Sequence, residues 1–107
     1  MGYEITLDQI LDSISFSSSR EFSDVVNQIC DELSVLYAEE LREQSNFWLG
    51  YTDDYKWEQL ELFVYSVVDL DISNPSSVKI YSILWNIPVS KAKRAMLDLE
   101  KEINRIV

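Results

Sequence analysis

Residues that form tight turns are rare in this chain, which contains two glycines and two prolines among 107 residues. Folds built from many short strands need such residues at most connections, roughly every 8–12 residues. The chain is therefore expected to contain few, long elements, which is typical of helices. Hydrophobic residues make up 47% of the sequence, enough to bury a core, and the length suits one domain. We predict a single all-α domain, an irregular bundle of about five helices.

The spacing of apolar residues locates the first helices. A short helix is expected to begin at a capping box formed by Thr6 and Gln9 and to end near Ile14. The clearest helix is expected from Ser19 to Gln44, because an apolar stripe recurs there at helical intervals. That stripe comprises Phe22, Val25, Val26, Ile29, Leu33, Leu36, Tyr37 and Leu41.

Three further helices are expected downstream. Asp53 or Asp54 is expected to cap the first of them, although the β-branched and aromatic segment 62–72 leaves a strand as the alternative there. Asn74 and Pro75 fit the cap and first position of the next helix. Its inward residues are expected to be Val78, Tyr81, Leu84 and Trp85. The last helix carries a heptad seam suited to packing on a neighbour, namely Ala92, Met96, Leu99, Ile103 and Ile106.

Histidine is absent from the sequence, which removes the usual general base near neutral pH and the commonest metal ligand. Carboxylates, lysine or tyrosine would have to carry any catalysis, so we expect no enzyme, no catalytic residue and no cofactor. The single cysteine, Cys30, lies in an apolar stretch and is expected to be a buried thiol. No basic, apolar leader opens the chain and no apolar run is long enough to span a membrane, so a cytoplasmic location is expected.

The charge is distributed unevenly along the chain. Residues 1–77 contain three basic and sixteen acidic residues, a balance of −13, whereas residues 78–107 contain six basic and three acidic, a balance of +3. Such asymmetry indicates interaction surfaces, because an acidic body attracts basic proteins and repels nucleic acid. The alternative is that the acidic residues only keep a helical domain soluble.

Two acidic segments are the candidate partner-binding surface. The acidic helix contributes Asp31, Glu39, Glu40 and Glu43. The stretch from Phe47 to Glu58 combines aromatic rings with carboxylates, and its candidates are Trp48, Tyr51, Asp53, Asp54, Tyr55 and Glu58. Aromatic rings supply contact area and carboxylates supply steering, so such stretches make good interface anchors. A core corner, where the loop folds back, is the alternative for these rings.

The segment Asp69–Ser73 has the spacing of the first three ligands of a calcium loop. The loop then fails, because Asn74 stands where a glycine is needed and Ile80 where a bidentate glutamate is needed. We therefore expect no metal site.

Residues 80–96 resemble a helix-turn-helix, with a helix, an Ile87–Pro88 turn and a second helix that begins with small and basic residues. The resemblance implies that the second helix enters the major groove of DNA. Its DNA-facing residues would be Ser90, Lys91, Lys93 and Arg94. On the outer face of that helix, Asp98 can also pair with Arg94 or Lys101, as on an ordinary solvated surface.

In size, charge and helix content the whole chain resembles small acidic helical inhibitors, such as the immunity proteins that neutralise nuclease bacteriocins. That resemblance implies a non-catalytic inhibitor or adaptor, either a toxin-immunity protein or a phage-type antagonist of a nuclease or defence factor. Its acidic, aromatic surface would bind a basic partner, such as a nuclease or another nucleic-acid-binding protein. The alternatives are a helix-turn-helix DNA-binding regulator and a structural subunit that uses the heptad seam. A homodimer is compatible with each of these readings.

Overall fold

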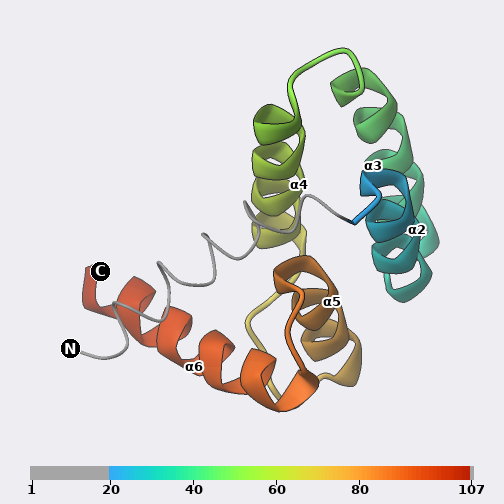
Figure 1. Cartoon of the computed structure of the whole chain (residues 1–107). Helices are drawn as coiled ribbons and strands as arrows, with labels where there is room; N and C mark the ends of the chain where they lie inside the picture. Colours follow the sequence, from blue (N-terminus) through green and yellow to red (C-terminus); the bar gives the residue numbers. More distant parts are fainter. Residues whose placement is uncertain (1–19, 107) are drawn as a thin grey trace.

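The computed structural model describes residues 20–106, and the side chains of residues 20–104. Five α-helices follow one another in this range: α2 (Phe22–Glu32), α3 (Val35–Trp48), α4 (Asp53–Val67), α5 (Pro75–Trp85) and α6 (Val89–Ile106) (Figure 1). No strand occurs among these residues, so the prediction of an all-α bundle is confirmed. The helix expected near Thr6 to Ile14 lies outside the described residues.

The helix expected from Ser19 to Gln44 is wrong in its length, because the structure divides it into α2 and α3. Leu33 and Ser34 have extended backbones, with ψ of 160° and 158°, and Ser34 occupies the N-cap position of α3. An unbroken helix of about 26 residues would be about 39 Å long and would carry half of its apolar stripe past the core. The break instead lets α3 fold back against α2.

The break changes which side of α3 is buried. Its inward residues are Ala38, Leu41, Ser45 and Trp48. Leu36 and Tyr37, which were expected in the apolar stripe, are exposed, Leu36 to 71%. The expected stripe continued the phase of α2, and that phase is lost at the extended residues 33–34.

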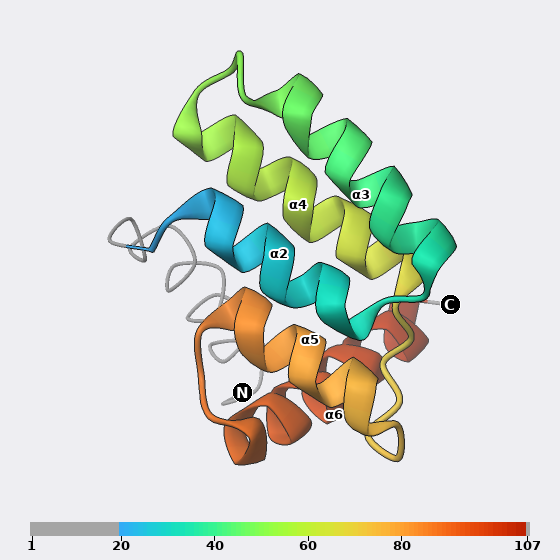
Figure 2. The same ribbon diagram turned by 90° about the vertical axis from the view of Figure 1, so that its right-hand side faces the viewer.

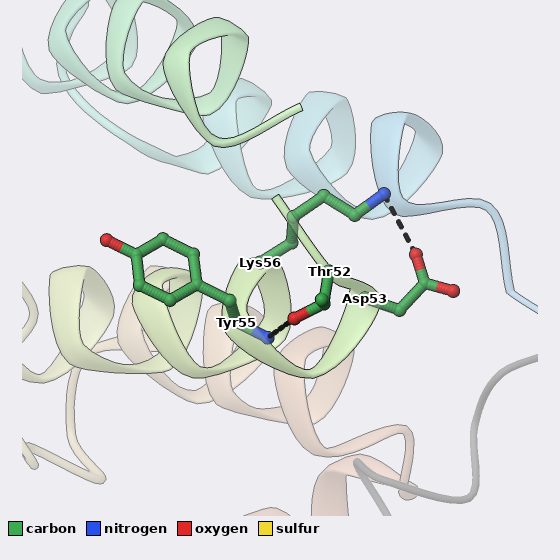
Figure 3. Close-up of polar contacts among 4 residues, drawn as sticks. All are labelled: Thr52, Asp53, Tyr55 and Lys56. Atoms are coloured by element: carbon green, nitrogen blue, oxygen red, sulfur yellow. Dashed lines mark hydrogen bonds and ion pairs between the residues drawn. The ribbon is translucent and has the colours of Figure 1, made fainter. Parts of the chain in front are cut away.

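Helix α4 begins at a cap that the sequence reading missed. The hydroxyl of Thr52 accepts a hydrogen bond of 3.3 Å from the backbone N–H of Tyr55, so neither Asp53 nor Asp54 is the cap. Both lie in the first turn, where negative charge is favourable, and Asp53 also pairs with Lys56 at 3.0 Å (Figure 3). The helix continues to Val67, so helix rather than strand is correct for the first half of segment 62–72.

The predicted start of α5 is confirmed. The side chain of Asn74 accepts hydrogen bonds from the N–H groups of Ser76 and Ser77, and Pro75 takes the first helical position. The helix ends at Asn86, whose φ of 56° lies in the left-handed region that commonly closes helices. The inward residues expected for this helix, Val78, Tyr81, Leu84 and Trp85, are all buried.

The core is organised around α2, which packs against both α3 and α5, while α4 packs on α3 and α6 packs on α5 (Figure 2). Aromatic residues connect α4 to α5: Trp85 Nε1 donates to the Tyr65 hydroxyl at 3.3 Å, and the Tyr81 hydroxyl donates to the Val68 carbonyl at 2.6 Å. Cys30 is buried against Ala38 as expected. The seam of α6 is buried at Ala92 and Met96 and is exposed at Ile103.

Candidate functional site

Three aromatic side chains lie together on the surface where α3 turns into α4. The Phe47 and Tyr51 ring centroids are 5.9 Å apart, and those of Tyr51 and Tyr55 are 4.5 Å apart. These side chains are 69%, 49% and 36% exposed, in that order. We call Phe47, Tyr51 and Tyr55 the aromatic tip. Exposed aromatic clusters occur at interaction sites, so the aromatic tip is the candidate contact surface.

The fold separates the tip from the other aromatic residues of the same stretch. Trp48 and Trp57 are 5% and 9% exposed, and Trp57 packs edge-on against Phe22 with centroids 5.2 Å apart. Neighbouring positions on a helix point about 100° apart, so burying Trp48 turns Phe47 toward solvent. The inclusion of Trp48 in the contact surface is therefore corrected, because its ring fills the core. The core reading of the stretch thus holds for Trp48 and Trp57, whereas Phe47, Tyr51 and Tyr55 stay exposed.

The connection between the two helices is short and adds apolar surface to the tip. The Tyr51 N–H donates to the Trp48 carbonyl at 2.9 Å, which closes the turn after α3. Leu49 in this turn is exposed. Gly50 has no positive φ, and a Cβ there would meet nothing within 4 Å, so the turn itself does not require glycine.

An acidic ridge leads along α3 to the tip, and we define it as Glu39, Glu40 and Glu43. All three are exposed on the side of α3 opposite its buried residues. Glu43 lies one helical turn before Phe47, and Glu39 lies one turn before Glu43. Glu40 accepts a hydrogen bond of 3.1 Å from Gln44, and no ion pair neutralises the ridge among the described residues.

The start of α4 brings three more carboxylates to the tip, from Asp53, Asp54 and Glu58, all of them exposed. Lys56 is the basic residue of this turn, and it is engaged by Asp53 and lies over the Phe22 ring at 5.5 Å. The ring of Tyr55 points away from that ion pair (Figure 3). The tip is thus bordered by negative charge from both helices.

Asp31 is exposed but does not lie beside the tip. It is near the end of α2, next to the start of α3, whereas the tip is at the other end of α3. The first turn of α3 exposes Val35 and Leu36, and sequence reasoning placed Leu36 in the core. The signal for an exposed Leu36 was present in Ser34, a residue type that often caps helices.

One carboxyl group near this surface has an unusual environment. Glu61 is half-buried on α4, and burial raises its pKa to about 7, with a smaller contribution from the negative charge of Glu58. The group therefore titrates close to neutral pH, although its location one turn beyond Glu58 leaves it off the aromatic tip.

The alternative DNA-binding residues lie on a different part of the molecule. Ser90, Lys91, Lys93 and Arg94 are all exposed in the first turns of α6, after the turn of residues 86–88. The turn contains no glycine, and Asn86 adopts the left-handed conformation in its place. Ion pairs between Asp98 and Arg94 or Lys101 are not formed, since the ion pairs within the described range join Lys56 to Asp53 and Lys79 to Glu32.

The calcium-like segment has a local structural role. The Asp71 carboxylate accepts hydrogen bonds from the N–H and hydroxyl of Ser73, at 2.9 and 2.6 Å, which lowers the pKa of Asp71. Across residues 20–106, no cluster of three or more potential metal-ligating side chains is present. Within the same range, no helix has the length and apolar character needed to cross a membrane.

No protein-family model, curated protein or solved structure matches this chain.

Proposed function

We propose that this protein is a non-catalytic inhibitor or adaptor that binds a basic partner protein through the acidic ridge and the aromatic tip. The observation that carries the proposal is the exposure of three neighbouring aromatic rings, Phe47, Tyr51 and Tyr55, at the end of an unneutralised row of carboxylates. Burying these rings in a complex would release their apolar surface from water. The fold has enough apolar residues to fill its core without them.

The two parts of the surface have different physical roles. Aromatic residues dominate binding energy at protein interfaces because they bury large areas with little loss of side-chain freedom. Carboxylates at the border contribute less to affinity, but they accelerate association with a positively charged surface. Together they favour a partner with an apolar pocket inside a basic surround.

Proteins that handle nucleic acids have surfaces of this kind, since their clefts collect positive charge to hold phosphates. A chain of net charge −10 is attracted to such a cleft over distances greater than contact. The resemblance in size and charge to immunity proteins supports the same class of partner. We therefore propose a nuclease or another nucleic-acid-binding protein.

The test is affinity capture from nuclease-treated host extract with three variants beside the native chain. The tip variant carries Phe47→Ala and Tyr51→Ala, and the ridge variant carries lysine at Glu39, Glu40 and Glu43. The matched control carries lysine at exposed acidic positions on other faces, Asp24, Asp69 and Glu100. Since each reversal adds two charges, the ridge variant and the control both move from −10 to −4.

We expect the native chain and the control to capture the same basic protein, and the tip and ridge variants to lose it. With the purified partner, ridge reversal should lower the association rate more than it raises the dissociation rate. Capture of one protein by all four chains in equal amounts would reject the proposal.

DNA binding is the second candidate function, and one observation favours it. The helix-turn-helix-like segment has a left-handed Asn86 at its turn and exposed Lys91, Lys93 and Arg94 at the start of α6. A mobility-shift assay with the triple Lys/Arg→Glu variant tests it. DNA bound at physiological salt by the native chain and lost in this variant would favour this candidate over the first.

A further inference from the structure

The outward face of α3 has a regular pattern. Leu36, Glu40, Glu43 and Phe47 recur at intervals of four, three and four residues, which places them on one stripe about 16 Å long. All four are exposed, and Glu39 lies beside them. The stripe is therefore negative in its centre and apolar at both ends, and no basic residue lies on it.

The outward face of α6 has the same spacing with the opposite charge. Ser90, Arg94, Leu97 and Lys101 recur at intervals of four, three and four residues, and Lys93 lies beside them. All five side chains are exposed, including the apolar Leu97. The stripe has an apolar centre between basic residues, and the half-buried Asp98 flanks it beside Arg94. Neither Asp98 nor the cations of the stripe have an ion-pair partner among the described residues.

The two stripes cannot meet within one molecule. Helices α3 and α6 lie at opposite ends of the bundle in both views (Figures 1 and 2), and each stripe faces away from the core. We propose that the α6 stripe of one molecule docks on the α3 stripe of a second copy. Leu97 then lies over the aliphatic parts of Glu40 and Glu43. The stems of Arg94 and Lys101 pack on the apolar ends of the partner copy's stripe, and their charged groups reach inward to the carboxylates.

Such a contact is heterologous, because two different surfaces meet. A pair of molecules still has one unused α3 stripe and one unused α6 stripe. Further copies can therefore add to the pair, and the result is a closed ring or an open chain. Exposed ion pairs contribute little individually, so the association is weak and reversible. The inference does not depend on the proposed function, although both use the acidic ridge, and a bound basic partner would block the self-contact.

Salt has two opposing effects on this contact. At about 10 mM salt the screening length is about 30 Å, so two molecules of net charge −10 repel each other as whole bodies. At about 0.15 M it is about 8 Å, and the attraction between facing stripes then outweighs the repulsion between the remaining charges. At about 1 M the stripe charges are screened as well. Association should therefore be strongest at intermediate salt.

Sedimentation velocity of the full chain, at protein concentrations from about 10 µM to about 1 mM, tests the proposal. Two charge-reversal variants are compared with the native chain. The first variant has Glu40→Lys and Glu43→Lys, and the second has Arg94→Glu and Lys101→Glu. Each variant alone should stay monomeric at concentrations where the native chain associates. An equimolar mixture should associate again, because each variant then offers the stripe that the other lacks. A control with Asp24→Lys and Asp69→Lys, which has the charge of the first variant, should associate like the native chain.

Circular dichroism establishes that each variant is folded before it is scored. A native chain that remains monomeric to about 1 mM at all salt concentrations would overturn the inference. So would a mixture that fails to recover association, or two variants that associate as well as the native chain. Partner capture by the same native sample would leave the proposed function standing in each of these cases.

Discussion

Replacing Arg20 is expected to destabilise the fold, because this side chain hydrogen-bonds the segment before α2 to the end of α5. Its guanidinium donates to the carbonyls of Ile83 and Leu84, the latter at 3.1 Å, and lies 5.1 Å from the centre of the Trp57 ring. The last carbonyls of a helix have no partner within the helix, so Arg20 acts as a side-chain cap from a distant part of the chain.

The size of the effect follows from these contacts. Hydrogen bonds to a charged group are worth about 1.5–3 kcal/mol each, and an exposed cation–π contact about 0.5–1 kcal/mol. Burial opposes this gain, as the lowered pKa of Arg20 indicates, and its Nε is buried without a hydrogen-bond partner in the described structure. The Ile83 carbonyl also accepts a hydrogen bond of 3.3 Å from the Asn86 N–H, so it keeps one partner when Arg20 is replaced. We therefore expect Arg20→Ala to cost about 2–3 kcal/mol and Arg20→Lys about 1–2 kcal/mol.

Urea unfolding followed by circular dichroism measures both losses. Arg42→Ala is the matched control, since it removes the same charge from an exposed position on α3 and should change stability by less than about 0.5 kcal/mol. An Arg20→Ala loss no larger than that of the control would refute the capping role.

Three further perturbations test other parts of the structure. Because the pKa of Glu61 is raised from 4.5 to about 7, its stabilising contribution is complete below pH 4.5 and is lost as pH rises through about 7. At pH 8, Glu61→Gln should therefore have a free energy of unfolding in urea about 1 kcal/mol above that of the native chain, after allowance for solvent screening. Below pH 4.5 the two free energies should be equal. A gain in stability that does not depend on pH would contradict this. The buried Cys30, whose pKa burial raises, should react with a thiol reagent slowly in the native state and rapidly in denaturant, and rapid native labelling would show the thiol to be accessible. Trp48→Ala should cost about 3–5 kcal/mol and Phe47→Ala less than about 0.5 kcal/mol, and equal costs would contradict their assignment to core and surface.

The helix content and the later helices followed from the sequence because their signals are local. Asn74 and Pro75 define the start of α5 through contacts within the next few residues. The first half of the α6 seam is buried as its period predicts, but Ile103 is exposed, because burial there depends on how far neighbouring elements extend. Local periodicity thus identifies a helix and the side it can bury, but it does not show how much of that side is covered.

The candidate site was predictable in its composition and not in its geometry. Leu36 was placed in the core because an unbroken helix would keep the apolar stripe of α2 on the same side through α3. The extended residues Leu33 and Ser34 break the helix, so the buried side of α3 is a different one. Phe47 and Trp48 are adjacent aromatic residues with similar hydrophobicity, and only the position of α2 and α4 around α3 determines which of them is buried. The clustering of Phe47, Tyr51 and Tyr55 likewise depends on a turn whose closure is not encoded by a positive-φ glycine.

Hydrogen exchange of the chain, free and bound to its captured partner, tests the central claim most directly, because it locates the contact surface without mutation. The proposal predicts that binding slows exchange across residues 36–58, which include the acidic ridge and the aromatic tip, while residues 86–101 are unchanged. Protection confined to residues 86–101, with the tip exchanging as in the free protein, would contradict it.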